Sequence, residues 1–288
     1  MKLLQEFSQT HDCIMGACDA SPLDESHYNG FTPFVSTDIK KRTDPSAILP
    51  SAKGVIVVGV GQTQSKSMET NAGAVLSSLG MDDDYHIRVR ALLRQLVGEL
   101  KQHHNFKHKI LVDSPNLDER AFAVRAGLGF LGRNGLVISQ KFGSRFNIGL
   151  LLHTIEGVAA TAAAQQTCSP NCRMCIDACP AKKNSQSKPL LSVTACLSYL
   201  TQKKELTADE EASISAAGQL YGCDICQNVC PFNAQCETNF ADTRIWLCMD
   251  DDAFAEKYGH TAMLWQGTEI LRRNARLIKN CNSTPNML

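Results

Sequence analysis

Hydrophobic and polar positions in the first 160 residues follow strand-like and helix-like patterns in turn. A β-branched run from Gly54 to Val60 predicts a buried strand, and apolar residues recur at helical spacing between Tyr85 and His104. Three further segments have the composition of strands: residues 109–113, 135–139 and 146–153. Ser114-Pro115 predicts a helix start, and Gly127 predicts its end. The pattern therefore predicts an α/β domain at the N-terminus.

The composition changes after this domain. A stretch rich in Ala, Gln and Thr, residues 159–167, predicts a linker, and a cysteine-dense module follows it. A last helical pattern over residues 267–280 precedes a polar tail that we expect to be mobile. The expected fold class is therefore α+β. It has an N-terminal α/β domain over residues 1–160, a cysteine module over 161–240, and a helical segment with its tail over 241–288.

Charge and targeting signals narrow the possible classes of protein. The 29 Lys and Arg residues balance the 29 Asp and Glu residues, so no global field steers the chain onto nucleic acid. The N-terminus has no apolar core of signal-peptide length, and the longest apolar stretch, Gly54–Gly61, is too short to span a bilayer. We therefore expect a soluble, cytoplasmic protein. In that reducing compartment, 13 cysteines indicate metal ligation rather than disulfides.

Eight of the cysteines fall into two related groups. Each group contains a Cys-x-x-Cys-x-x-x-Cys-Pro run, and the runs end at Cys179-Pro180 and Cys230-Pro231. Bacterial ferredoxins bind two 4Fe–4S clusters through such runs, and the last cysteine of each run ligates the other cluster. This exchange predicts one cluster on Cys168, Cys172, Cys175 and Cys230, and a second on Cys179, Cys196, Cys223 and Cys226. We therefore expect a ferredoxin-like module with two clusters.

Structural zinc sites are the alternative, because Cys-x-x-Cys is also a common zinc spacing. Zinc does not require the x-x-x-Cys-Pro extension, which occurs here twice. Three residues separate Cys168 from Cys172 where the ferredoxin pattern has two, and we expect Pro170 to shape a bulge there. The five other cysteines are expected to be ordinary thiols: Cys13, Cys18, Cys236, Cys248 and Cys281.

Motifs along almost the whole chain resemble the epoxyqueuosine reductase family. They are Lys41–Pro45, Asp84–His86, Val112–Ser114, Glu119–Arg120, Arg125–Phe130, Arg133–Asn134, Ala195–Thr201, Leu220–Gln227, Phe254–His260 and Arg273–Ala275. The resemblance implies an oxidoreductase that uses two 4Fe–4S clusters and cobalamin to reduce epoxyqueuosine to queuosine in tRNA. It further implies an external electron donor such as flavodoxin or ferredoxin. Family members of full length continue into a helical-repeat domain, so we expect a short form.

The resemblance also implies roles for individual residues. Asp113 matches a carboxylic acid that faces the corrin, while Asp84 and His86 match positions near the substrate. Positions that match the lining of the cobalamin site are Arg42, Ser77, Val137, Ile148, Leu151, Ser198, Cys223 and Asp224. Lys204 matches a position near the tRNA.

Asp113 and the substrate each leave an alternative open. Asp113 ends a predicted strand, where desolvation would raise the pKa of a general acid, but it could instead cap the following helix. A dehalogenase-like reductase of small molecules and a plain electron carrier are the alternative functions. Asp82 and Asp83 would repel phosphate. Arg272, Arg273, Arg276 and Lys279 form a basic cluster that is either a solvated helix face or a contact for RNA.

Overall fold

The computed structural model divides the chain into two compact units. It describes residues 2–28, 33–62, 74–81, 83–182, 193–233, 239–241, 243–248 and 250–282. The first unit comprises residues 1–61 and 86–172, and the second comprises residues 62–85 and 173–288. Of the positions on which predictions fall, Asp82, Cys236 and residues 283–288 lie outside the described residues, as do the side chains of Lys279 and Cys281.

These units differ from the predicted boundaries at 160 and 240. Residues 62–85 group with the second unit because β3 (Ala74–Leu76) pairs there with β8 (Gln219–Tyr221) and with β9 (Asn239–Ala241). Backbone hydrogen bonds thus carry a segment from the middle of the predicted α/β domain into the unit that holds most of the cysteines. Hydrophobic periodicity does not reveal such a long-range pairing.

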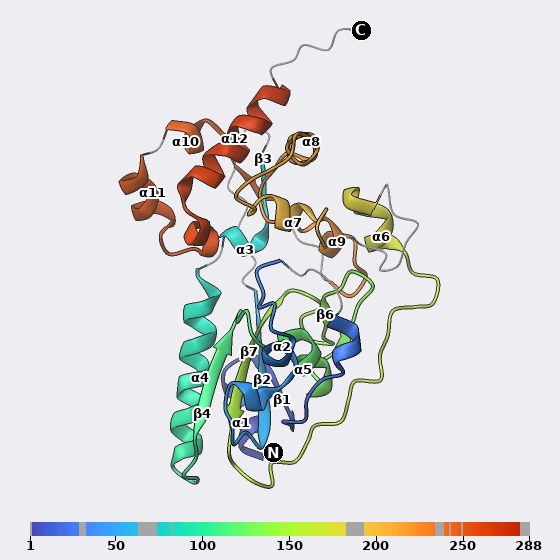
Figure 1. Ribbon diagram of the computed structural model, residues 1–288, viewed down its shortest axis with the longest axis vertical. Helices are drawn as coiled ribbons and strands as arrows, with labels where there is room; N and C mark the ends of the chain where they lie inside the picture. The colour runs from blue at the N-terminus through green and yellow to red at the C-terminus, as the bar shows by residue number, and fades with distance from the viewer. Residues whose placement is uncertain are drawn as a thin grey trace. The chain divides into compact units, whose positions relative to one another are not determined.

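The first unit contains a four-stranded antiparallel sheet in the order β1-β2-β7-β4 (Figure 1). Its strands are β1 (Cys13–Asp19), β2 (Gly54–Gly61), β7 (Phe146–His153) and β4 (His108–Val112). The predicted strands at 54–60, 109–113 and 146–153 are thereby confirmed, while β1 was not predicted. The segment 135–139 forms only the short β6 (Val137–Ile138), paired with β5 (Phe130–Leu131).

Helices cover both faces of this sheet. α5 (Glu119–Arg125) packs on one face, where its fully buried Phe122 joins the core with Leu150 and Leu152. Successive strand residues point to opposite faces. Gly149 therefore faces the other side, where α4 (Tyr85–Lys101) lies; a Cβ at Gly149 would stand 2.5 Å from Val89. The remaining helical pieces are α1 (Lys2–Thr10), α2 (Ile39–Thr43), η1 (Glu25–Tyr28) and η2 (Pro45–Ala47).

The helix predicted to begin at Ser114 begins instead at Glu119. Asp118 is its N-cap, and the Asp118 carboxylate accepts hydrogen bonds of 3.1 Å from the amides of Arg120 and Ala121. Residues 114–118 form a loop in which the Ser114 hydroxyl accepts from the Asn116 amide at 3.2 Å. The helix starts at the aspartate because that side chain satisfies two of the amides that a helix start leaves without partners.

The second unit is mainly helical around a small sheet in which β3 runs parallel to β8 and antiparallel to β9. Its helices are α3 (Ser78–Met81), α6 (Met174–Ala178), α7 (Leu197–Leu200), α8 (Ala208–Ala217), α9 (Ile225–Asn228), α10 (Thr243–Cys248), α11 (Asp251–Tyr258) and α12 (Thr268–Asn282), with the 3-10 turns η3 (Pro180–Lys182) and η4 (Ala262–Gln266). Across the described ranges, no helix has the length and apolar character needed to cross a membrane.

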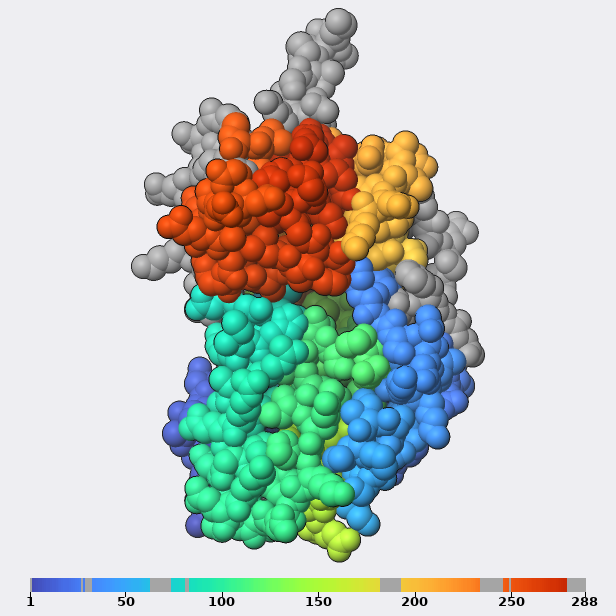
Figure 2. All heavy atoms as spheres, turned by 60° about the vertical axis from the view of Figure 1, so that its left-hand side comes forward, coloured from blue at the N-terminus to red at the C-terminus, as the bar shows by residue number. Residues whose placement is uncertain are grey.

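An aromatic core supports the C-terminal helices of this unit. Trp246 of α10 stacks on Tyr258 of α11 with ring centroids 4.6 Å apart, and it meets Phe254 edge-on at 5.0 Å. α12 packs against α8 and α10, and in Figure 2 its red atoms adjoin the gold atoms of α8. α12 confirms the helix predicted over residues 267–280 and makes it part of the second unit rather than a separate segment.

Candidate functional site

Asp113 and His86, two of the predicted catalytic residues, lie together in the first unit. Asp113 directly follows β4 and has φ +49°, in the left-handed region that side chains other than glycine seldom adopt. His86, in the first turn of α4, places Nε2 3.4 Å from Asp113 Oδ2. The Asp113 side chain is 68% exposed, against 23% for His86. The pair therefore presents an accessible carboxyl group beside an imidazole that can exchange a proton with it.

The predicted burial of Asp113 is wrong, and so is its alternative role as a helix cap. The left-handed turn directs the carboxyl group outward instead of leaving it under the sheet, and Asp118 caps α5. The desolvated carboxyl group of this loop belongs to Glu119. Although part of that residue reaches the surface, burial raises the pKa of its carboxyl group to about 8.

Asp84, the third predicted catalytic residue, belongs to the second unit. Its backbone N–H donates to the carbonyl oxygen of His260 at 2.7 Å, and the neighbouring Asp83 forms a β-bridge with Thr261. The Asp83 carboxylate is 88% exposed and lies 4.0 Å from His260 Nε2. The structure thus groups His86 with Asp113 in one unit, and it fixes the segment of Asp84 to residues 260–261 in the other.

Four of the predicted cobalamin-lining residues lie in the first unit. The Arg42 guanidinium lies 4.8 Å above the centre of the Tyr28 ring, and its residue is only 7% exposed. Val137 and Leu151 belong to the buried core, with 3% and 0% exposed, whereas Ile148 is partly exposed. Of the three aliphatic residues, Ile148 therefore has the side-chain surface most available to a ligand.

The other predicted lining residues lie around the Gly222 turn of the second unit. Asp224 Oδ2 accepts hydrogen bonds from both the backbone N–H (2.7 Å) and the hydroxyl of Ser78. A Cβ at Gly222 would stand 2.1 Å from the Ser77 hydroxyl, so only glycine allows Ser77 this close to Cys223. The Ser77 hydroxyl is buried, and the described residues offer it no hydrogen-bond partner. A buried hydroxyl in this state fits a polar group of a bound cofactor.

Ser198 is also in the second unit, on α7. Its carbonyl oxygen accepts from the Gln202 side chain at 2.6 Å and from the Thr201 hydroxyl at 3.3 Å. These contacts turn the chain at the end of α7, directly after Cys196 and the helix that it begins. The backbone that carries Ser198 is therefore fixed to the loop that follows it.

Two of the four thiols predicted to hold the second cluster, Cys223 and Cys226, are desolvated in the second unit. The pKa of Cys223 and of Cys226 is raised to about 12, mainly by burial, and the thiols of Cys196 and Cys179 contribute to the rise in both. Among the described residues no three His, Cys, Asp or Glu side chains are placed to hold a metal ion, so the ligand set of this cluster stays a prediction. Iron supplies the positive charge that would hold such thiols as thiolates, so the donor set fits a 4Fe–4S cluster.

The remaining cluster cysteines are divided between the units. Cys175 of α6 and Cys230 are buried in the second unit, where α6 packs against α9, the helix of Cys226. Cys168 and Cys172 lie at the C-terminal end of the first unit. The inserted residue is accommodated by a turn in which the Cys172 amide donates to the Ser169 carbonyl at 3.0 Å. Arg133 donates to the Pro170 carbonyl at 2.6 Å, and the described cysteines form no disulfide.

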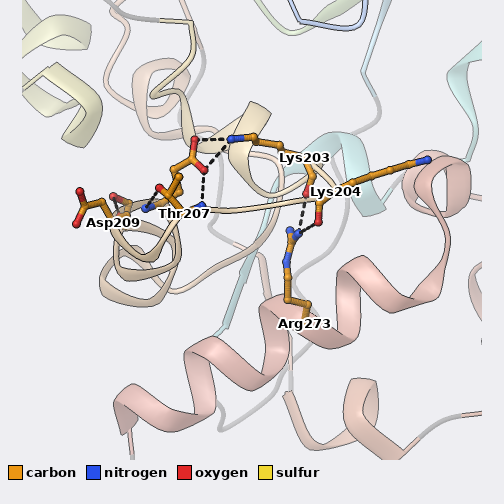
Figure 3. A network of polar contacts seen from close by, with 7 residues as sticks. Lys203, Lys204, Thr207, Asp209 and Arg273 are labelled. Carbon is orange, nitrogen blue, oxygen red and sulfur yellow. Dashed lines mark hydrogen bonds and ion pairs between the residues drawn. The ribbon is translucent and has the colours of Figure 1, made fainter.

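Lys204, predicted to lie near tRNA, is exposed on the loop between α7 and α8. Arg273 of α12 donates to the backbone carbonyls of Lys203 and Lys204, both at 2.7 Å. Lys203 Nζ binds both carboxylate oxygens of Glu210 at 2.8 Å, and Glu210 forms a capping box with Thr207 at the start of α8. Figure 3 shows the Lys204 side chain extending away from Arg273. The backbone of Lys204 is thus fixed while its ammonium group remains accessible.

Asn274, next to Arg273, fixes the same region from the interior. It is fully buried, and its Nδ2 donates to the carbonyls of Thr201 at 2.8 Å and Leu220 at 2.9 Å. The Thr201 hydroxyl in turn accepts from the Gly222 amide at 2.9 Å. We call Arg273 and Asn274 the α12 anchor. The α12 anchor joins the loop after Cys196 to the strand before Cys223.

The structure corrects the expectation of a basic cluster on α12. Arg272 is 13% exposed and binds Asp251 at 2.7 Å and Glu269 at 2.9 Å. Arg273 is engaged with backbone carbonyls, which leaves Arg276 as the exposed arginine of the three. Carboxylates therefore bind the guanidinium group of Arg272, and backbone carbonyls bind that of Arg273. Of the three arginines, only Arg276 lies on a solvated helix face as predicted.

The predicted site did not include Glu119, Ser78 or Asn274. Glu119 and Asn274 lie in motifs that carried the resemblance, but neither had a role assigned to it. A carboxylate at the first position of a helix and an asparagine inside one were the available signals, because asparagine is otherwise unfavourable there. Ser78 gave no such signal, since its contact with Asp224 spans 146 residues.

Comparison with known sequence families matches two segments of the chain. Residues 42–114 match the family described as "Epoxyqueuosine reductase QueG, DUF1730", and residues 168–233 match the "4Fe-4S double cluster binding domain". The first segment includes Asp113 and His86. The second includes all eight predicted cluster cysteines.

Similar proteins cover nearly the whole chain. An epoxyqueuosine reductase from Staphylococcus aureus is 32% identical over 91% of this chain and 75% of its own length, and one from Bacillus subtilis is 30% identical over 85% and 67%. The structure of the Streptococcus thermophilus epoxyqueuosine reductase superimposes with a TM-score of 0.87 at 29% identity, covering 99% of this chain and 82% of the other. An epoxyqueuosine reductase bound to an epoxyqueuosine-modified tRNA-Tyr stem loop superimposes with a TM-score of 0.83 at 25% identity, covering 96% and 80%.

Proposed function

Because this chain belongs to the epoxyqueuosine reductase family, we propose that it reduces epoxyqueuosine to queuosine in tRNA, the last step of queuosine biosynthesis. The relatives span both units of the chain, so the proposal covers the pair of Asp113 and His86 as well as the cysteine loops. The observation that carries the proposal is this pair. Asp113 presents an exposed carboxyl group from a left-handed turn, and this group lies 3.4 Å from the imidazole of His86. A reductive elimination of oxygen needs such a proton donor beside its substrate.

The proposed cofactors are two 4Fe–4S clusters and a cobalamin. The clusters would take the ligand sets predicted by the exchange of the two Cys-Pro runs, and the match of residues 168–233 to the double-cluster domain, which contains all eight cysteines, supports them. When bound, cobalamin supplies a cobalt centre that passes electrons from the clusters to the substrate. The residues that would hold it are Arg42, Ser77, Val137, Ile148, Leu151, Ser198, Cys223 and Asp224. The buried Ser77 hydroxyl is the clearest support for a polar contact.

The protons of the reaction are assigned to Asp113 and His86. Converting an epoxide to an alkene consumes two electrons and two protons, and it releases the oxygen as water. Asp113 would protonate the departing oxygen, and His86 would return a proton to Asp113 across the 3.4 Å contact. Asp84 is proposed to contact the substrate. In the B. subtilis relative, a catalytic aspartate loop has been seen swung out of the active site, and we assign Asp113 to the corresponding loop.

The tRNA would reach Lys204, whose exposed ammonium can neutralise a phosphate. A one-electron donor of the flavodoxin or ferredoxin class would reduce the clusters. Exposed apolar residues beside cluster cysteines, Met174 at 52% and Phe232 at 39%, suit a transient contact with such a donor. A tRNA substrate and oxidation-sensitive thiolates both favour the cytoplasm as the place of action.

Asp113→Asn tests this function in protein reconstituted anaerobically with iron, sulfide and cobalamin. Asparagine also tolerates the left-handed backbone, so the fold, the clusters and bound cobalamin should be retained. Turnover of tRNA carrying epoxyqueuosine should fall ~100- to 10,000-fold, the usual contribution of a general acid. Asp12→Asn is the matched control, since Asp12 has φ +47° and an 86% exposed side chain.

Normal turnover by Asp113→Asn would reject the assigned proton donor. Failure of the wild-type protein on tRNA, together with reduction of a small halide or epoxide, would replace this function with that of a small-molecule reductase. Failure to bind cobalamin would leave an electron carrier. Each outcome is separated by absorption spectra of the cofactors and by nucleoside analysis of the tRNA.

A further inference from the structure

The side chain of Glu119 binds the backbone of the loop that carries Asp113. The loop leaves β4 after Val112 and enters α5 at Glu119, whose Oε1 accepts the Ser114 backbone N–H at 3.0 Å. The Ser114 amide is part of the peptide bond that joins it to Asp113. The side chain at the end of the loop therefore holds the peptide at its beginning.

Other contacts fix the ends of this loop. The Pro115 carbonyl accepts from the Ser36 amide at 2.7 Å, and the Asp118 amide donates to the Arg42 carbonyl at 3.0 Å. Before the turn, Arg90 donates to the Val112 carbonyl at 3.2 Å. Asp113 lies between these supports with φ +49°, a conformation that persists only where its surroundings impose it. The Glu119 contact acts directly on the Asp113–Ser114 peptide.

The two carboxyl groups of this loop have opposite environments. Asp113 is 68% exposed and faces His86, whereas the Glu119 carboxyl is desolvated. Burial is the main cause that raises the pKa of Glu119 to about 8, and the charge of Asp113 adds to it; the amides of Ser114 and Asp113 and the charge of His86 act in the opposite direction. Near neutral pH the group is therefore mostly protonated, and its carbonyl oxygen still accepts the Ser114 amide.

We propose that Glu119 is a positioning residue that imposes the left-handed backbone at Asp113 and thereby directs the Asp113 carboxyl group toward His86 and the substrate. This inference rests on the proposed role of Asp113 as proton donor. Ionisation of Glu119 would strengthen the hydrogen bond from the Ser114 amide and add a negative charge beside Asp113, so activity should depend on the protonation of Glu119 at alkaline pH. The charged groups facing Glu119 are Asp113 on the loop and His86 on α4, while Asp118 is occupied by the amides of α5 and by the Tyr28 hydroxyl.

Three variants of the anaerobically reconstituted protein test the proposal: Glu119→Ala, Glu119→Gln and Asp118→Asn. Hydrogen exchange of the segment 113–118 is measured by mass spectrometry alongside kcat and KM on epoxyqueuosine-containing tRNA. Glu119→Ala should raise exchange at the start of this segment at least ~10-fold. It should lower kcat by about 100-fold with little change in KM, the cost of misplacing a reacting group by about 1 Å. Cluster and cobalamin spectra should stay as in wild type.

The other two variants separate positioning from support of the helix. Glu119→Gln retains an acceptor for Ser114, so it should keep the slow exchange while the alkaline limb of the kcat profile near pH 8 disappears. Asp118→Asn changes the charge at the same helix start without touching Ser114, and it should change neither exchange at Ser114 nor the alkaline limb. Wild-type exchange in Glu119→Ala, an alkaline limb that survives in Glu119→Gln, or equal effects from Asp118→Asn would each overturn the proposal. If Glu119→Ala fails to fold, the pH profile of Glu119→Gln decides alone.

The exchange measurement also separates this inference from the proposed function. It requires no turnover and no substrate. Opening of the 113–118 segment in Glu119→Ala with full activity in Asp113→Asn would reject the function of Asp113 but retain the structural effect of Glu119. Unchanged exchange with an inactive Asp113→Asn would reject the positioning role alone.

Discussion

The loop of Asp113 and the loop of Lys204 are held in place by side chains of different chemistry. Each presents an exposed ionisable side chain on a backbone held by a buried polar group. The Asp113 loop is held by Glu119, six positions away, whose charge changes near pH 8. The Lys204 loop is held by the α12 anchor, whose guanidinium and amide groups do not titrate in the working range. The first loop is therefore local and pH-sensitive, whereas the second depends on the packing of a helix about 70 positions away.

Asn274→Ala should have the largest effect, because it removes the buried support of the Lys204 loop and leaves the Asp113 loop unchanged. The substitution leaves the buried carbonyls of Thr201 and Leu220 without their donor and opens a cavity, so we expect a loss of about 2–4 kcal/mol of unfolding free energy. Because these carbonyls flank Cys196 and Cys223, the EPR signal of their cluster should broaden or disappear while the other cluster persists. Asn274→Asp lacks the donor and should behave alike despite its equal size. Arg276→Ala, on the exposed face of the same helix, is the control, and equal damage from it would contradict the role of Asn274.

Glu119→Gln should remove the pH dependence that distinguishes the Asp113 loop from the Lys204 loop. The folded pKa of about 8 lies above the unfolded value near 4.5, so the folded state keeps a proton that the unfolded state has lost. The wild-type protein should therefore lose stability as pH rises between these values. Relative to wild type, Glu119→Gln should gain about 3–4 kcal/mol between pH 5 and pH 8. Urea unfolding at three pH values measures the difference, and parallel curves for the two proteins would show that Glu119 is not desolvated.

The smallest expected effects concern RNA binding. Lys204→Ala should weaken tRNA binding a few-fold and reduce the log–log salt slope by about 0.7–0.9, the contribution of one phosphate contact. Arg273→Gln should weaken binding less and leave the slope unchanged, because the charge of Lys204 remains while its backbone loosens. Titrations over a salt series distinguish the two. A reduced slope in Arg276→Gln would extend the RNA contact to α12 and restore part of the expected basic cluster.

The sequence predicted what depends on short spacing. β-branched runs and helical periodicity located β2, β4, β7 and α4, and cysteine spacing identified the double-cluster segment matched by its family. β1 was not predicted, because Cys13–Asp19 mixes small and sulfur-containing residues without β-branched enrichment. The start of α5 was predicted four residues too early, because Ser114 and Asp118 are both possible N-caps. Only the folded structure shows that Asp118 satisfies two amides of the helix.

Contacts across long separations account for the rest. The exposure of Asp113 follows from one left-handed residue, which pattern analysis cannot distinguish from a strand end. The α12 anchor joins Asn274 to Thr201 across 73 positions and to Leu220 across 54. Both contacts involve backbone carbonyls, whose position carries no sequence signal. Residue identity therefore located the functional motifs, while their supporting contacts required the folded chain.

The two tryptophans of this chain give the Lys204 loop an optical reporter. Trp246 is 1% exposed in the aromatic core, whereas Trp265 is 52% exposed and donates through Nε1 to the Gln202 side chain at 2.8 Å. Gln202 stands two residues before Lys204, so the indole shares a hydrogen bond with the loop proposed to meet RNA. Replacing Trp246 with phenylalanine would leave a single emitter at that loop. Its emission wavelength in the apoprotein would register the loop's occupation by RNA without any attached dye.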